Sequence, residues 1–193
     1  MDLPVRMSDG ERELFVRTLA KATHYMEFGS GGSTLLAIRS PAKIVLSVES
    51  DPAWLDRIRE HPEIAQAVAA QRLFLTLADI GPVGEWGRPT DETRQAQWPH
   101  YYADPFFATD ILFDLILIDG RFRVATALAA AACAAESATI VMHDYELRSQ
   151  YYLVEKFFDI EETRESLYVL RRRKAINIRS FYMEVMRHLF EHG

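Results

Sequence analysis

The chain has 193 residues, 49% of them hydrophobic, and a formal net charge of −6. This length suits a single domain over residues 1–193, and its one cysteine, Cys133, set in an alanine-rich helical run, excludes an internal disulfide or a cysteine-based zinc site. The acidic balance, the charged N-terminus without a secretion signal, and the lack of a run near ~20 apolar residues favour a cytoplasmic protein with neither a nucleic-acid nor a membrane partner.

Helices and strands alternate along the first half of the chain. Ser8 and Asp9 offer N-caps to a first helix, and Pro52 opens a later one at a position where its missing N–H does no harm. In chain order we expect a helix over residues 8–20, a strand over 23–28, a helix over 34–39, a strand over 43–48, helices from Pro52 and over 62–70, and a strand over 73–77.

Residues 81–110 interrupt this alternation with no steady hydrophobic period. A segment this long without a helix or strand is uncommon in a compact domain and is usually functional. Its aromatic residues either line a ligand pocket or only fix the segment to the domain. They are Trp86, Trp98, His100, Tyr101, Tyr102, Phe106 and Phe107.

The alternation then resumes with a strand over 113–118, a helix over 124–135, a strand over 139–142 and a helix over 148–157. Short segments over 158–163 and 166–171, joined by a polar turn, indicate an antiparallel pair at the sheet edge. A final amphipathic helix spans 178–190. Its stripe of Ile178, Tyr182, Val185 and Leu189 packs against the sheet, with a homodimer contact as the alternative.

This order of elements predicts an α/β fold: one Rossmann-like, doubly wound, mostly parallel sheet with helices on both faces and an antiparallel hairpin at one edge. In such sheets, ligands bind at the carboxyl ends of the strands, where the strand order reverses. The candidate positions are those that follow the strands: residues 29–34, 49–51, 79–80, 119–123 and 143–145.

A turn with glycines at positions 29, 31 and 32 follows the first strand. It lets the backbone approach a ligand, and the helix start behind it offers N–H groups. Glu49 lies about 20 positions after the first glycine, the spacing of a carboxylate that binds ribose hydroxyls. Glu27, just before the turn, would repel a pyrophosphate but attract the ammonium and sulfonium of S-adenosylmethionine. Thr34 stands where a dinucleotide-binding turn has its third glycine, which also opposes a dinucleotide.

Four segments, in the right order, resemble motifs of class I S-adenosylmethionine-dependent methyltransferases. EFGSGGST at 27–34 is similar to the first motif of that superfamily, and SVESD at 47–51 to the acidic motif after its second strand. ADIG at 78–81 falls where the superfamily has an adenine contact. FDLILIDG at 113–120 is similar to the fourth-strand motif of small-molecule O-methyltransferases.

The resemblance implies how the cofactor would lie. Its methionine part would lie at the glycine turn and its ribose at Glu49. Asp79 would accept a hydrogen bond from the adenine amine, although a turn role for Asp79 is an equal alternative. The implied cofactor-binding residues are Glu27, Gly29, Ser30, Gly31, Gly32, Ser33, Thr34, Glu49, Ser50, Asp79, Ile80 and Asp119.

Asp119 and His143, at two strand ends, are the catalytic candidates. In the metal-dependent O-methyltransferases that this stretch resembles, an aspartate in the place of Asp119 binds a divalent ion. Asp119 and Asp144 would then supply two oxygens to Mg²⁺; alternatively, His143 acts as general base. Residues 120–123 (GRFR) depart from the pattern of that subfamily. Their two arginines either clamp an anionic substrate or are exposed residues of the next helix.

The sequence therefore predicts an S-adenosylmethionine-dependent methyltransferase that acts on a small molecule at oxygen. Two alternatives stay open: a nicotinamide-dinucleotide-dependent oxidoreductase on a related fold, and a non-catalytic protein that binds S-adenosylmethionine.

Overall fold

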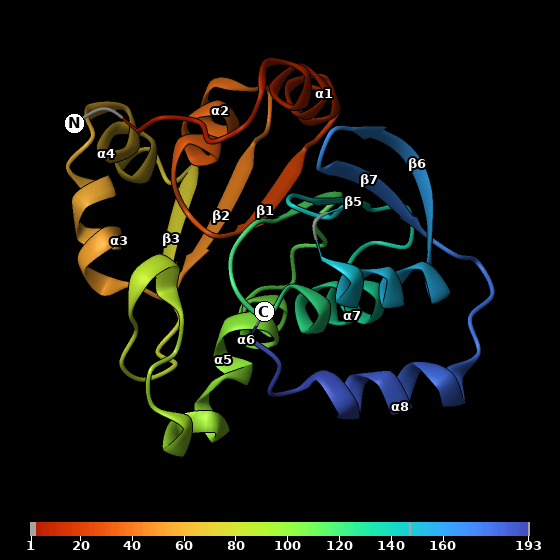
Figure 1. The fold of residues 1–193 in the computed structure, drawn as a ribbon. Helices are drawn as coiled ribbons and strands as arrows, with labels where there is room; N and C mark the ends of the chain where they lie inside the picture. Colours follow the sequence, from red (N-terminus) through yellow and green to blue (C-terminus); the bar gives the residue numbers. More distant parts are fainter. Residues whose placement is uncertain (1–2, 147, 193) are drawn as a thin grey trace.

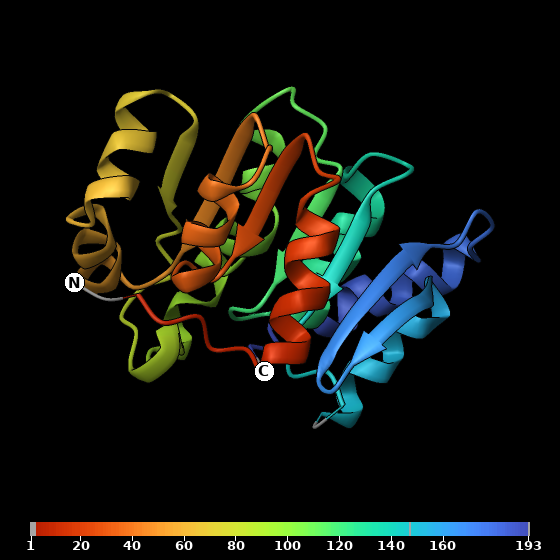
Figure 2. The same cartoon turned by 90° about the horizontal axis from the view of Figure 1, so that it is seen from above.

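The computed structural model describes residues 3–146 and 148–192, which form one seven-stranded sheet (Figure 1). The strands are β1 (His24–Phe28), β2 (Ile44–Glu49), β3 (Leu73–Leu77), β4 (Leu115–Ile118), β5 (Thr139–Met142), β6 (Phe158–Arg164) and β7 (Leu167–Arg172), in the spatial order β3-β2-β1-β4-β5-β7-β6. The first five are parallel, and β7 pairs antiparallel with both β5 and β6. This arrangement confirms the predicted Rossmann-like sheet and its edge hairpin, which lies at the far end from β3 (Figure 2).

Helices cover both faces of the sheet (Figures 1 and 2). One face carries α1 (Asp9–Leu19), α2 (Gly32–Arg39), α3 (Pro52–Arg59) and α4 (Pro62–Ala69), and the other carries α7 (Arg123–Cys133), the 3₁₀ helix η3 (Ser149–Lys156) and α8 (Ile178–His188). In β4, Leu115 and Leu117 pack in the hydrophobic core on the face of α1 to α4. Ile116 and Ile118 pack in the core on the face of α7, η3 and α8. Because β4 is buried on both faces, it reads in the sequence as a continuous apolar run.

Capping residues fix where several helices begin. Ser8 caps α1 and exchanges hydrogen bonds with Glu11 in a capping box. Asp51 caps α3, and Pro52 occupies the first helical position. Cys133 is the last residue of α7 and is half-buried.

Residues 81–110 are more regular than the sequence indicates. They contain the 3₁₀ helices η1 (Glu85–Gly87) and η2 (Glu92–Gln97) and the short helices α5 (Pro99–Tyr102) and α6 (Asp104–Phe107). Three of their aromatic residues pack around Phe122 with ring centroids 5.4 to 5.7 Å away and so fix the segment to the domain: Trp98, Tyr101 and Tyr102. Trp86 and Phe107 are instead largely exposed, so the aromatic residues do not form one common pocket.

The predicted apolar stripe of the final helix, α8, is partly packed against the core and partly exposed to solvent. Val185 and Leu189 pack against the core that contains α7, whereas Ile178 and Tyr182 are exposed. None of the helices within residues 3–146 and 148–192 combines the length and apolar character that crossing a membrane requires.

Candidate functional site

The turns that follow β1 and β4 touch at the point where the strand order reverses. Gly29 has a φ of +97°, and a Cβ added there would lie 3.0 Å from the Cα of Gly120. A Cβ on Gly120 would overlap the hydroxyl of Tyr101. Both positions therefore require glycine. Their contact fixes the glycine turn beside the end of β4, at the edge where α/β sheets bind ligands.

The other two glycines of the turn have different surroundings. A Cβ on Gly32 would lie 2.6 Å from the carbonyl oxygen of Pro4, so the N-terminal segment lies against the turn. Within residues 3–146 and 148–192, a Cβ on Gly31 would meet only a ring carbon of Trp54, at 3.9 Å. The indole Nε1 of Trp54 donates to the carbonyl oxygen of Ser30 at 2.8 Å. Space therefore remains over Gly31, bounded by the Trp54 ring.

Glu27 lies beneath the glycine turn and is completely buried. Its Oε1 accepts hydrogen bonds from Thr34 and, at 2.6 Å, from Ser47, and its Oε2 accepts one from the Tyr25 hydroxyl at 2.9 Å. Burial raises the pKa of Glu27, while the hydroxyl donors oppose that rise. The buried carboxyl group thus links α2, β1 and β2 through hydrogen bonds to one hydroxyl group from each element. This placement differs from the expected contact with a cationic ligand, because both oxygens face inward to hydroxyl groups.

Glu49 ends β2 and ties the glycine turn to this strand. Its Oε2 accepts from the backbone N–H of Ser30 at 3.1 Å, and its Oε1 accepts from those of Ser50 at 2.7 Å and Asp51 at 3.0 Å. Burial raises the pKa of Glu49, and these backbone donors act in the opposite direction. Ser50 donates to the carbonyl oxygen of Gly87 at 3.3 Å, so η1 lies against the end of β2.

Asp79 and Ile80 follow β3 at the same edge of the sheet. The exposed Asp79 accepts a hydrogen bond from the N–H of Gly81 at 3.0 Å, as a turn aspartate does. Ile80 is buried within the core that contains α7. The arrangement of Asp79 matches its turn alternative, and the adenine contact stays a prediction.

Arg123, at the start of α7, lies between the carboxylates of Asp119 and Asp144. Its Nη2 is 3.2 Å from an oxygen of each, and its side chain is only 3% exposed. His143 completes the cluster: its Nδ1 lies 3.0 Å from Asp119, and its Nε2 lies 3.4 Å from Glu11. Two cationic side chains and three carboxylates therefore meet at the ends of β4 and β5.

His143 is charged at neutral pH. Burial disfavours the charge, but the hydrogen bond to Asp119 and the charges of Asp119, Asp144 and Glu11 together raise the pKa of His143 to about 9. An imidazolium donates from both nitrogens and accepts no proton. The role of general base expected for His143 therefore does not fit this arrangement.

Solved methyltransferase structures share this fold. A methyltransferase-like protein from Silicibacter pomeroyi superposes with a TM-score of 0.86 and 29% identity over 98% of both chains. A methyltransferase from Geobacter sulfurreducens has a TM-score of 0.55 and 13% identity, over 88% of this chain and 80% of that one. An RNA methyltransferase from Salinibacter ruber, in complex with S-adenosyl-L-homocysteine, has a TM-score of 0.53 and 13% identity, over 90% and 97%. No protein-family model and no curated protein match the sequence.

These structural neighbours support the class I S-adenosylmethionine-dependent methyltransferase superfamily for this chain.

In this methyltransferase the candidate metal ligands do not fit Mg²⁺. Ligand atoms of Asp119, His143 and Asp144 lie within 4.8 Å of one another, close enough to share an ion. However, the guanidinium of Arg123 bridges the two carboxylates, and the charged His143 donates to one of them. Two cations of the protein thus compete with Mg²⁺ for these carboxylates, so the arrangement does not favour the expected ion.

Glu11 is the member of this cluster that sequence reasoning missed. Its Oε1 accepts hydrogen bonds from the N–H and hydroxyl of Ser166 at 3.0 and 2.6 Å, and its Oε2 faces His143. The only sequence signal at Glu11 is its capping-box spacing from Ser8, which predicts a helix start and no contact with β5.

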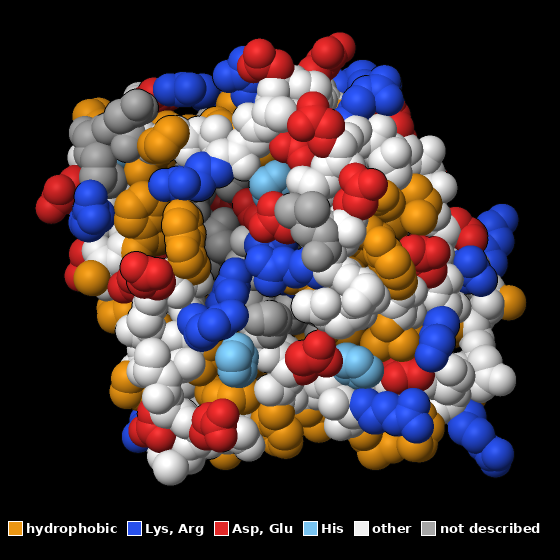
Figure 3. Space-filling model, in the orientation of Figure 1, with side chains coloured by type: hydrophobic (Ala, Val, Ile, Leu, Met, Phe, Trp, Pro, Cys, Tyr) orange, Lys and Arg blue, Asp and Glu red, His pale blue; other side chains and the backbone are white. Residues whose placement is uncertain are grey.

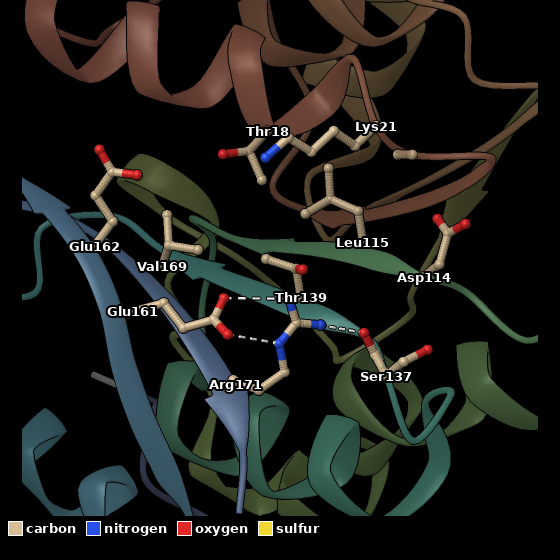
Figure 4. Close-up of a pocket in the computed structure, with 11 residues that line it drawn as sticks. Thr18, Lys21, Asp114, Leu115, Ser137, Thr139, Glu161, Glu162, Val169 and Arg171 are labelled. Atoms are coloured by element: carbon tan, nitrogen blue, oxygen red, sulfur yellow. Dashed lines mark hydrogen bonds and ion pairs between the residues drawn. The ribbon is translucent and has the colours of Figure 1, made fainter.

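A cleft of about 300 Å³ lies at the opposite end of the sheet, where β4 and β5 begin (Figure 4). Arg171 within it pairs with Glu161 at 3.0 Å, and Asp114 accepts from the backbone N–H groups of Thr23 and His24. Because these charges have partners and the cleft lies away from the glycine turn, we assign it no part in methyl transfer.

Proposed function

We propose that the protein binds S-adenosylmethionine over the glycine turn and transfers its methyl group to an oxygen of a small molecule. One observation carries this proposal: the turn lies where the strand order reverses, with open space over Gly31 and the carboxylate of Glu49 beside it. Within the superfamily fold, this is the place at which a nucleoside ligand is expected.

The start of α2 supports binding of the methionine carboxylate. The N–H groups of Gly32 and Ser33 belong to the first helical turn, where backbone amides have no partner within the helix. Such amides favour an anionic group. Glu27 would contribute from beneath, by holding Thr34, rather than by touching the cofactor.

Asp119 is our candidate for the group that receives the proton of the acceptor. The cofactor supplies an activated methyl group, so the protein orients the acceptor and removes its proton. The contacts from His143 and Arg123 both reach Oδ1 of Asp119, which leaves Oδ2 for the acceptor hydroxyl. Asp119 would take up the proton of the acceptor as the methyl group passed from the sulfur of the cofactor to the acceptor oxygen. His143 and Arg123 are positioning residues in this proposal.

A small molecule is the acceptor class that we propose, although one structural neighbour methylates RNA according to its name. The net charge of −6 gives no overall attraction to a polyanion. Cytoplasmic location and a homodimer through the exposed side of α8 stay predictions.

Calorimetry with S-adenosylmethionine and S-adenosylhomocysteine tests the proposal. We expect both to bind and Glu49→Gln, which keeps the size of the side chain, to weaken binding at least tenfold. If neither ligand binds to the folded protein, the proposal is wrong. Saturable binding of NADH would support the oxidoreductase instead, and cofactor binding without turnover on a broad acceptor panel would support a non-catalytic protein.

A further inference from the structure

Arg121 is a buried arginine with no counterion in the part of the chain that the structure describes. It is 9% exposed, and no carboxylate of residues 3–146 and 148–192 lies within ion-pair distance of its guanidinium. Its Nε is buried and has no hydrogen-bond partner in the described part of the chain. A buried charge without a partner is costly, so such groups are normally paired. Arg121 therefore has an unused capacity to bind an anion.

Further positive charge lies close to Arg121. Burial lowers the pKa of its guanidinium, and the charges of Arg123 and Arg148 lower it further. Among these three arginines, only Arg123 contacts carboxylates within the described residues. The face that contains the strand ends shows basic side chains gathered near its centre (Figure 3). The local field therefore favours an anion despite the acidic balance of the chain.

Tyr151 adds a second buried polar group without a partner. Its ring is 1% exposed, and its hydroxyl forms no hydrogen bond with any described residue. The guanidinium carbons of Arg123 and Arg148 lie 5.9 and 5.8 Å from its ring centroid. A phenol hydroxyl and two guanidinium groups can all donate to the oxygens of one anion.

We propose that Arg121, Arg148 and Tyr151 form a subsite for an oxyanion, a carboxylate or phosphate group, on the methyl acceptor. The assignment to the acceptor rests on the proposed function, because Arg121 follows the proposed base Asp119 by two residues. The burial of Arg121 and Tyr151 favours a small anion over the backbone of a polynucleotide, which would need a wide, exposed groove. The acceptor is thus a small hydroxylated molecule that carries an acidic group.

The first experiment measures anion binding without any cofactor. Inorganic phosphate and acetate are titrated into the protein at constant ionic strength, and thermal stability and the arginine Nε–H signals in NMR spectra are recorded. We expect saturable stabilisation and a shift of the Arg121 Nε–H signal. Arg121→Met and Arg148→Met should each weaken the apparent affinity at least tenfold. Arg171→Met, which removes an arginine paired with Glu161 at the other end of the sheet, should leave it unchanged.

A second readout separates binding from a structural role. Because Arg121 is buried and unpaired, Arg121→Met should leave the anion-free protein at least as stable as the parent. Arg121→Lys, which keeps the charge but loses the planar fork, should retain only part of the phosphate affinity. Equal phosphate affinity in the parent and in Arg121→Met would overturn the proposal, as would a lack of saturable binding by both anions. Tighter competition by an oligonucleotide than by phosphate would overturn it in favour of a polynucleotide.

This experiment is independent of the proposed methyl transfer. Arg121→Met should keep the affinity of the parent for S-adenosylhomocysteine, because Arg121 lies outside the predicted cofactor residues. If phosphate binds at Arg121 while S-adenosylhomocysteine does not bind at all, the proposed function fails and the oxyanion subsite stands.

Discussion

The Nε2 atom of His143 lies 3.4 Å from Oε2 of Glu11, a residue 132 positions earlier in the chain. The Nδ1 atom of the same ring lies 3.0 Å from Asp119. One charged ring therefore joins the first turn of α1 to the ends of β4 and β5. A substitution of Glu11 in α1 should consequently alter the charge and position of His143 and, through His143, those of Asp119, the proposed proton acceptor.

The free energy of unfolding should fall as the pH rises from about 6.5 to 9. The pKa of His143 is raised to about 9 in the folded protein, above its ordinary value of 6.5. Its stabilisation is then complete below pH 6.5 and is lost as the pH passes the folded value, at most about 3 kcal/mol in total. Urea unfolding of the parent and of His143→Gln at pH 6, 7.5 and 9 checks this. A difference between the two proteins that stays constant with pH would contradict it.

Glu11→Gln should lower the pKa of His143, because it removes one of the carboxylates that favour the imidazolium. Histidine ring signals followed by NMR over pH 5 to 10 report this pKa directly. Glu13→Gln is the matched control, since it removes the same charge from an exposed position of the same helix. An equal pKa of His143 in both variants would show that the Glu11 contact does not act on the ring.

Removal of Arg123 should both destabilise the protein and create affinity for Mg²⁺. Arg123→Gln leaves Asp119 and Asp144 with His143 as their one remaining cation among the described residues, at a cost of about 1.5 to 3 kcal/mol. The freed oxygens then suit a divalent ion. Calorimetry should detect Mg²⁺ binding to the variant but not to the parent, and a chelator should leave the activity of the parent unchanged. Mg²⁺ binding of equal strength to both proteins would contradict the role assigned to Arg123.

Gly31→Ala should abolish cofactor binding with little change in stability. A Cβ at this position meets only Trp54, at an ordinary 3.9 Å, but it fills the space proposed for the ligand. Calorimetry with S-adenosylhomocysteine and thermal unfolding measure the two effects. Gly10→Ala, in α1, is the control. Its Cβ would lie at an ordinary distance of 3.5 Å from a carboxylate oxygen of Glu165 and would not enter the space over Gly31, so cofactor binding should stay intact. Unchanged affinity in Gly31→Ala would place the cofactor elsewhere.

Gly29→Ala should instead destabilise the fold, by about 1 to 3 kcal/mol. The residue combines a φ of +97° with a Cβ position 3.0 Å from Gly120, so alanine meets both strain and a backbone contact. Chemical denaturation measures the loss. A stability equal to that of the parent would show that the two turns can move apart.

The sequence predicted the sheet well because its signals are local. The apolar run of β4, the caps at Ser8 and Asp51 and the polar turn of the edge hairpin each act within a few residues. The site was harder to predict, because its chemistry depends on side-chain direction and distant partners. Glu27 turns inward to hydroxyl groups, and Arg123 turns back between two carboxylates. The spacing of residues in the sequence does not predict either of these side-chain directions.

The contact of Gly120 with the Tyr101 hydroxyl restricts how this sequence can vary. A side chain at position 120 would need a shorter residue at 101, such as phenylalanine, and its Cβ would still lie 3.0 to 3.1 Å from backbone atoms of Gly29 and Phe28. The backbone N–H of Arg121, which donates to this hydroxyl at 3.2 Å, would then lose its acceptor. Positions 101 and 120 are therefore expected to change together during evolution, and a double substitution at 101 and 120 should be tolerated better than alanine at 120 alone.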